Sequence, residues 1–225
     1  MTGVPDVPLV ATLRRLLQPP ATAAERCELC AAELPRPHRH LVDVHTRRLL
    51  CVCGVCGTLE PMSRAQDGPA APRYRAVSRR FEALAPEIAD AQWRALAVPV
   101  DLAFFFFNTT LGRAVGFYPG PTGATESQFP AEAWEALADS VPAIRTMAPD
   151  VEALLVRRTD ARVAAYIVPI DACYELVGRI RTGWSGFGGG AAVREAIEDF
   201  FSAVRERSAG QGPAGGPCAG ERPRA

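Results

Sequence analysis

Lysine is absent from this sequence, and histidine is nearly so. All 25 basic side chains are arginine, 25 acidic side chains balance them, and the formal net charge is +0. A chain without excess positive charge has no general attraction for phosphate, so nucleic acid is not the expected partner. The last of the three histidines is His45. This removes most acid–base and hydrolase mechanisms from the rest of the chain.

Long apolar runs are also missing. The longest, residues 98–107, is interrupted by Pro99 and Asp101, and it cannot cross a hydrocarbon core of about 30 Å. No apolar segment follows Arg14 and Arg15, as a secretory leader would require. We therefore expect a cytoplasmic protein with no membrane-spanning segment. Its seven cysteines then need an explanation other than a secretory disulfide framework.

The remaining patterns predict an α+β protein. A small four-cysteine ribbon precedes an α+β domain with antiparallel hairpins and C-terminal helices. The chain is 48% hydrophobic, enough for a folded core. We expect an N-terminal helix in 1–25, a metal-binding ribbon in 26–60, a linker in 61–72, the α+β domain in 73–207 and a disordered tail in 208–225.

Hydrophobic periodicity and turn residues predict the elements of the larger domain. The expected helices are 90–96, 129–137, one that begins at Asp171, and 191–207, and the expected strands are 102–107, 113–118, 152–158 and 162–168. Four consecutive phenylalanines, 104–107, predict a strand buried on both faces rather than a stacking platform for bases. Residues 119–127 are expected to form a polar loop.

Five of the seven cysteines lie close together near the N-terminus. Four of them form two C-x2-C pairs, Cys27 with Cys30 and Cys53 with Cys56. Two such turns can bring four thiolates to one ion, while backbone N–H groups bond to the sulfur atoms. The result is a tetrahedral site suited to Zn²⁺ or to a single iron. Residues 41–44 and 48–53 are strand-like and would form a hairpin that returns the second pair to the first.

The fifth of these cysteines, Cys51, leaves the ligand set open. In an extended strand Cys51 and Cys53 point to the same side, so Cys51 is either an alternative ligand or a buried thiol. Cys53 is preferred because it completes a C-x2-C pair followed by Gly57. A [2Fe–2S] centre drawing on all five thiols is a weaker alternative, because the plant-type spacing is absent. His38 and His40 are interpreted as exposed polar residues of a loop.

The polar loop of the larger domain offers a rim for partner binding, since binding residues often lie on loops. The candidate residues are Pro119, Thr122, Glu126 and Ser127. Elsewhere in that domain, Cys173 has no histidine to act as its base, so nucleophilic catalysis is not expected.

Several segments, in a fixed order, carry a family resemblance: RCELC, HRHLVD, RRLLCVCGVC, PVDLAFFF, FYPGPTGATES, PDVEALLVRR, YIVPIDACYELVGRIR and W-x-G-F-x-G-G. They resemble an uncharacterised family of high-GC bacteria, typically encoded beside uptake [NiFe]-hydrogenase genes. The resemblance covers residues 26 to about 204. It implies a hydrogenase subunit or maturation factor as the protein partner. The N-terminal part also resembles a zinc ribbon or rubredoxin-like knuckle, but Gly54-Val55 and the extra Cys51 depart from rubredoxin and favour zinc.

These observations favour a non-enzymatic metal-binding accessory protein that supports [NiFe]-hydrogenase maturation or assembly through protein–protein contacts. Zinc is the expected cofactor, with iron as the alternative. A rubredoxin-like electron-transfer protein is the second interpretation. A zinc-ribbon nucleic-acid-binding regulator is the third, and only a local basic strip supports it, formed by Arg36, Arg39, Arg47 and Arg48.

Overall fold

The computed structural model describes residues 24–58 and 72–210, apart from 86, 161 and 187. The expected N-terminal helix and nearly all of the expected linker and tail lie outside the described residues. Two antiparallel sheets organise the described chain, a small one with strand order β2-β1-β3 and a large one with order β4-β9-β8-β5-β6-β7. The α+β class predicted from the sequence is confirmed.

The small sheet is built on the expected hairpin. Strands β1 (Arg39–Asp43) and β2 (Arg48–Val52) pair in register, and a short 3-10 helix, η1 (Cys56–Thr58), follows them. The third strand, β3 (Tyr74–Ala76), adds to the other edge of β1. The ribbon sheet therefore takes one strand from after the segment expected to be a linker.

The large sheet contains the strands β4 (Glu82–Ala83), β5 (Leu102–Asn108), β6 (Arg113–Gly120), β7 (Gly123–Ser127), β8 (Glu152–Arg158) and β9 (Val163–Pro169). Its central strand β5 is buried on both faces from Ala103 to Phe106, as the phenylalanines predict, whereas Phe107 is exposed. Phe104 and Phe106 pack into one core, and Ala103 and Phe105 pack into the other. Alternation of side chains across a strand accounts for this division.

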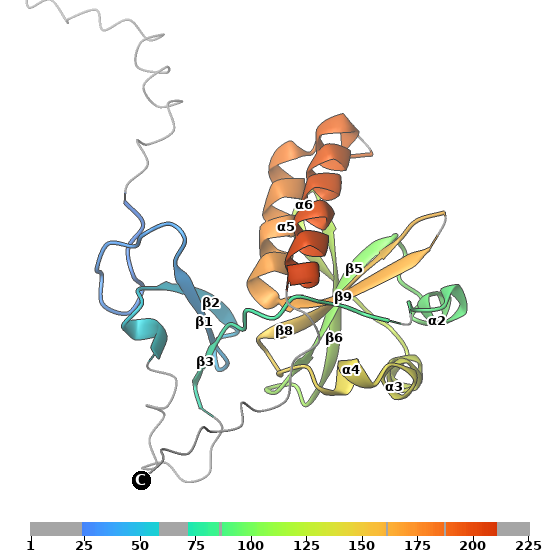
Figure 1. Ribbon diagram of the computed structural model, residues 1–225, viewed down its shortest axis with the longest axis horizontal. Helices are drawn as coiled ribbons and strands as arrows, with labels where there is room; N and C mark the ends of the chain where they lie inside the picture. The colour runs from blue at the N-terminus through green and yellow to red at the C-terminus, as the bar shows by residue number, and fades with distance from the viewer. Residues whose placement is uncertain (1–23, 59–71, 86, 161, 187, 211–225) are drawn as a thin grey trace, which may run out of the picture.

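Helices cover both faces of the large sheet (Figure 1). Helices α5 (Ile170–Gly183) and α6 (Gly190–Gly210) pack against one face. Helices α2 (Asp90–Ala95), α3 (Ala131–Ser140) and α4 (Pro142–Arg145) pack against the other. None of the helices in the described part of the chain is long and apolar enough to span a membrane.

The expected polar loop at 119–127 is wrong, because most of it is strand. β6 continues to Gly120, and after a two-residue turn β7 returns to pair with it. Gly120 lies opposite Gly123, whose φ of 126° is open to glycine alone. The short polar side chains of β7 misled the interpretation, since an edge strand needs little apolar content.

The ribbon hairpin has two apolar faces. Leu41, Leu50 and Val52 form a small core with two of the cysteines. Val42 and Val44 point to the opposite side, where they join the core between the large sheet and α5. The Val44 carbonyl also accepts a 2.8 Å hydrogen bond from the Thr110 hydroxyl. The ribbon is thus packed against the large domain.

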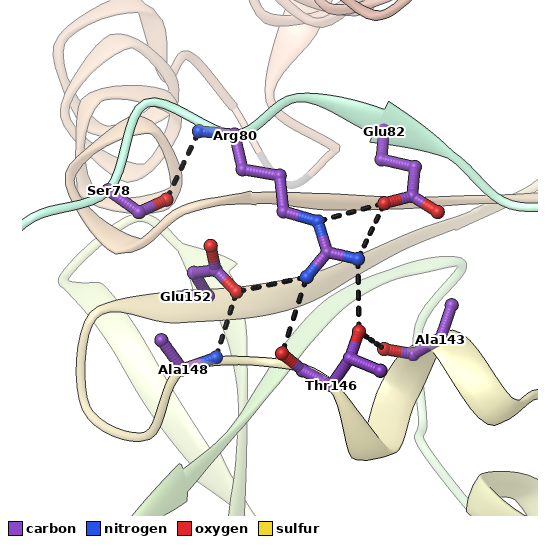
Figure 2. A network of polar contacts seen from close by, with 7 residues as sticks. All are labelled: Ser78, Arg80, Glu82, Ala143, Thr146, Ala148 and Glu152. Carbon is purple, nitrogen blue, oxygen red and sulfur yellow. Dashed lines mark hydrogen bonds and ion pairs between the residues drawn. The ribbon is translucent and has the colours of Figure 1, made fainter. Parts of the chain in front are cut away.

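A half-buried arginine fixes the segment that leads from the ribbon to β4 (Figure 2). The Arg80 guanidinium donates to the carboxylates of Glu82 and Glu152 and to the hydroxyl and carbonyl oxygens of Thr146. Glu152 also accepts a 2.8 Å bond from the Ala148 amide. All the guanidinium nitrogens are engaged, so this network ties the chain together and leaves no donor free for a ligand.

Candidate metal centre

Each C-x2-C pair sits in a tight turn that directs its two thiols toward the other pair. In the first turn the Cys27 amide donates to the Ala32 carbonyl at 2.8 Å, and Ala31 adopts a φ of 60°. In the second turn the Gly57 amide donates to the Cys53 carbonyl at 2.9 Å and opens η1. A Cβ on Gly57 would lie 2.7 Å from Cδ of Arg39. Glycine at 57 therefore lets the second turn lie against β1.

The two turns bring together the four thiols that the sequence singled out. The Sγ atoms of Cys27, Cys30, Cys53 and Cys56 all lie within 4.8 Å of one another. Those of Cys30 and Cys53 are 3.7 Å apart. Four sulfur atoms placed tetrahedrally at about 2.3 Å from a zinc ion are about 3.8 Å apart. The spacing of the thiols therefore suits one ion at their centre.

The surroundings of the thiols also suit a metal. Cys27 and Cys56 are only 2% and 6% exposed, so one side of the site is shielded from solvent. Cys30 lies on the exposed side. Burial acts to raise the pKa of the Cys27 thiol, but hydrogen bonds from the backbone of Cys53, Leu29 and Cys30 lower it to about 6. Burial and the neighbouring thiols raise the pKa of Cys56 to about 12. Without a cation, one thiol favours the deprotonated form and the other the protonated form. A bound cation would favour deprotonation of both, because thiolates are the species that coordinate metals.

Contacts to β2 hold the first turn in place. The Cys51 amide donates to a Glu28 carboxylate oxygen at 2.7 Å, and the Glu28 amide donates to the Cys51 carbonyl at 2.9 Å. Arg48 forms an ion pair with the same carboxylate at 3.2 Å. The hairpin therefore positions the first C-x2-C turn through contacts with the backbone and side chain of Glu28, while the second turn follows β2 directly.

Cys51 stands apart from the four-thiol group. It belongs to a second group of potential ligands, with His38 and His40. β2 ends at Val52, so strand alternation does not carry over to Cys53 and the two thiols diverge. The interpretation of both histidines as exposed is wrong, because the His38 and His40 side chains are 12% and 23% exposed. His40 contacts Asp171 of the large domain and His38 packs beside His40, which no local pattern reveals.

The predicted partner-binding residues occupy the β6–β7 hairpin. Thr122 is exposed in its turn, Pro119 is half-buried, and Ser127 is buried. The Glu126 carboxylate is exposed and forms an ion pair with Arg113 at 3.2 Å. Glu126 also lines a cleft of about 380 Å³ that runs from the ribbon hairpin to β5 and β6. Of the four residues, Glu126 and Thr122 are accessible to a partner.

Sequence reasoning missed the role of Asp171. It was expected only to begin a helix, yet its Oδ2 lies 2.8 Å from Nδ1 of His40. The two residues are 131 positions apart, so only the tertiary fold brings them together. Cys173, two residues further on, is fully buried, and burial raises the pKa of its thiol well above the ordinary value.

Comparison with known proteins places the chain in a family without describing its activity. A model of a family of unknown function, DUF5947, matches residues 26–208. The match includes both C-x2-C turns and the two sheets. No curated protein matches, and no solved structure does.

Proposed function

Since the chain belongs to the DUF5947 family of unknown function, we propose that it is a non-enzymatic accessory protein built around one structural zinc ion. Cys27, Cys30, Cys53 and Cys56 would be its ligands. The observation that carries the proposal is the convergence of four thiols, with the 3.7 Å separation of Cys30 and Cys53 close to that of a tetrahedral site. All four positions of such an ion would be filled by protein, as is usual for structural zinc.

The role of such an ion would be to hold the ribbon in shape. Five buried residues form the ribbon core, and two of them are ligands. A core this small contributes little stability by itself, so metal binding would supply much of the folding free energy of the ribbon. The folded hairpin would then present one wall of the cleft that Glu126 and Arg48 line.

The partner proposed is a subunit or maturation factor of a [NiFe]-hydrogenase. The support for this partner is the resemblance of the ordered sequence segments to proteins encoded beside hydrogenase genes. The exposed Glu126, at the edge of the cleft between ribbon and sheet, supports a surface for protein contact. The same proposal implies that the protein is located in the compartment that contains this hydrogenase partner.

Metal analysis of anaerobically purified protein tests the ion. We expect a colourless protein whose zinc remains through desalting, and a Cys53→Ser variant that loses it. A red or brown product with stoichiometric iron would instead support the rubredoxin-like electron-transfer protein, because iron–thiolate charge transfer absorbs visible light.

Gene deletion tests the partner. Loss of the gene should lower hydrogenase activity under conditions that express the enzyme, and Cys53→Ser should fail to restore it because the ribbon unfolds. Glu126→Ala should also restore less activity, while its circular dichroism spectrum stays unchanged. Thr182→Ala, on the exposed side of α5, is the matched control and should restore activity fully. Normal hydrogenase activity in the deletion strain would contradict the proposed partner.

A further inference from the structure

The second group of potential ligands lies on the face of the ribbon that turns toward the large domain. Donor atoms of His38, His40 and Cys51 all lie within 4.8 Å of one another. His40 and Cys51 are directly opposite in the β1–β2 register, so their side chains share a face. The next pair on that face, Val42 and Leu49, packs into the core of the large domain.

His40 is held in one orientation by the large domain. Its Nδ1 lies 2.8 Å from the Asp171 carboxylate at the start of α5. A hydrogen bond from Nδ1 to a carboxylate leaves Nε2 with its lone pair free. This is the usual outer-shell arrangement of a metal-binding histidine, in which the carboxylate fixes the ring and raises its basicity.

The ring nitrogens of His38 lack polar contacts that a bound ligand could provide. Both of its ring nitrogens are buried, and neither has a hydrogen-bond partner among the described residues. The Glu25 carboxylate is 3.6 Å from Nδ1, which is too long for a hydrogen bond. The ring instead meets the ring of His40 edge-on, with centroids 4.8 Å apart. Buried polar atoms are almost always paired, so this histidine points to an unfilled contact.

The His40–Asp171 contact by itself could be only a tie between ribbon and helix. Such a tie explains neither the two unpartnered nitrogens of His38 nor the thiol of Cys51 beside them. The backbone of Cys51 is also held in place, because its amide and its carbonyl both form hydrogen bonds with Glu28. Three donors of the kinds that borderline metals prefer are therefore assembled from β1, the residue just before it and β2.

We propose that His38, His40 and Cys51 bind a second Zn²⁺ ion, distinct from the ion of the four thiols. Imidazole and thiolate are both good zinc ligands. On binding, the Cys51 thiol releases its proton to solvent, and small side-chain rotations bring the donors to bonding distance. Three protein ligands leave a fourth position for water or an external ligand, an open position that structural zinc sites lack.

The position of the site gives it access to solvent and a link to the large domain. Cys51 is half-buried and the His40 side chain is 23% exposed, so an external ligand can reach the ion. Through His40 the ion would act on Asp171 and α5, while the four-thiol ion lies on the other side of the same hairpin. Asp171 is a positioning residue here, because it would not touch the metal.

Cobalt titration of the full-length apoprotein tests the site, because Co²⁺ occupies zinc sites and absorbs according to its ligands. Wild-type protein should take up two equivalents, the first with a strong four-thiolate absorption and the second with a weaker one from a single thiolate. Cys51→Ala and His38→Gln should each take up one, with the four-thiolate absorption intact. His45→Gln, an exposed histidine in the hairpin turn, is the matched control and should take up two.

The titration also separates this site from the four-thiol centre. One equivalent in wild type, Cys51→Ala and His45→Gln alike would overturn the second site and leave the first in place. Loss of the four-thiolate absorption in Cys51→Ala, with the fold intact by circular dichroism, would make Cys51 a ligand of the first ion and overturn the proposal. No uptake by wild type would overturn both.

Asp171→Asn provides a readout that a purely structural tie would not give. The amide keeps the shape of the side chain but lacks the negative charge that an outer-shell carboxylate contributes to a metal-bound histidine. The affinity for the second equivalent of Zn²⁺, measured by chelator competition, should fall by about 10- to 100-fold. The first equivalent should bind unchanged. Equal affinity for the second equivalent in wild type and Asp171→Asn would contradict the positioning role.

Discussion

Nη1 of Arg75 lies 3.8 Å from the Asp150 carboxylate and 3.1 Å from the Pro149 carbonyl oxygen. Arg75 is in β3 of the ribbon sheet, whereas Asp150 precedes β8 of the large sheet. Asp150 is 5% exposed and also accepts hydrogen bonds from the amide and hydroxyl of Thr109. A charge pair at this depth makes β3 an anchor between the two sheets.

Arg75→Met should therefore destabilise the protein. The substitution keeps an apolar stem but leaves the Asp150 carboxylate without its cation, which should lower the free energy of unfolding by about 2 kcal/mol. Urea denaturation of metal-saturated protein measures the change. Arg181→Met, at an exposed position of α5, is the control and should stay within about 0.5 kcal/mol of wild type. Equal effects of both variants would contradict the anchoring role.

Metal removal should loosen the whole ribbon sheet, including the strand that lies far from the thiols in sequence. β3 pairs only with β1 among the described strands, so its amides lose their partners when the hairpin unfolds. Hydrogen exchange after chelation should accelerate across β1, β2 and β3, while α3 stays protected. If the β3 amides stayed protected after the amides of β1 and β2 had lost their protection, β3 would be held by the large domain alone.

Two glycines should respond in opposite ways to alanine. A Cβ on Gly116 would lie 2.8 Å from the ring of Phe105, which is fully buried and cannot move aside. Gly116→Ala should cost about 1–3 kcal/mol. Gly178, inside α5, has nothing within 4 Å of an added Cβ, and Gly178→Ala should stabilise by about 0.5–1 kcal/mol. Thermal unfolding of the two variants beside wild type checks both signs.

The Asp43 carboxyl should make the folding stability of the protein depend on pH in the acidic range. A hydrogen bond from Arg73 lowers the pKa of this carboxyl against the effect of burial, and the amide of Thr46 assists. Because the folded pKa lies below the unfolded value, the stabilisation is complete above the unfolded pKa. It is lost as pH falls through the folded pKa. Carbon NMR titration should give Asp43 a pKa below the ordinary value of about 3.9. Arg73→Gln should raise that pKa, and an unchanged value would contradict the assignment.

Local patterns were enough to predict the strands and helices whose apolar residues alternate or recur. The phenylalanine strand, the β8–β9 hairpin and α6 are confirmed, because burial on one or both faces leaves its period in the sequence. The β7 strand was missed because its residues are short and polar. Spacing also singled out the four thiols that the structure brings together.

Pairings between distant segments left no trace in the sequence. Neither the contact of His40 with Asp171 nor the pairing of β1 with β3 follows from any local signal. His38 is half-buried beside His40, which a stretch rich in proline and arginine does not indicate.

The strand order β2-β1-β3 has a consequence for chain continuity. The segments before residue 59 and after residue 71 contribute strands to one sheet and side chains to one core. Residues 24–58 and 72–210, produced as separate polypeptides, should therefore recognise each other through the open edge of β1 and the Val42 face. Zinc would then be needed to shape the shorter piece before it could bind. In such a split protein, the two chains should associate only when metal is available, so their association would measure the supply of metal.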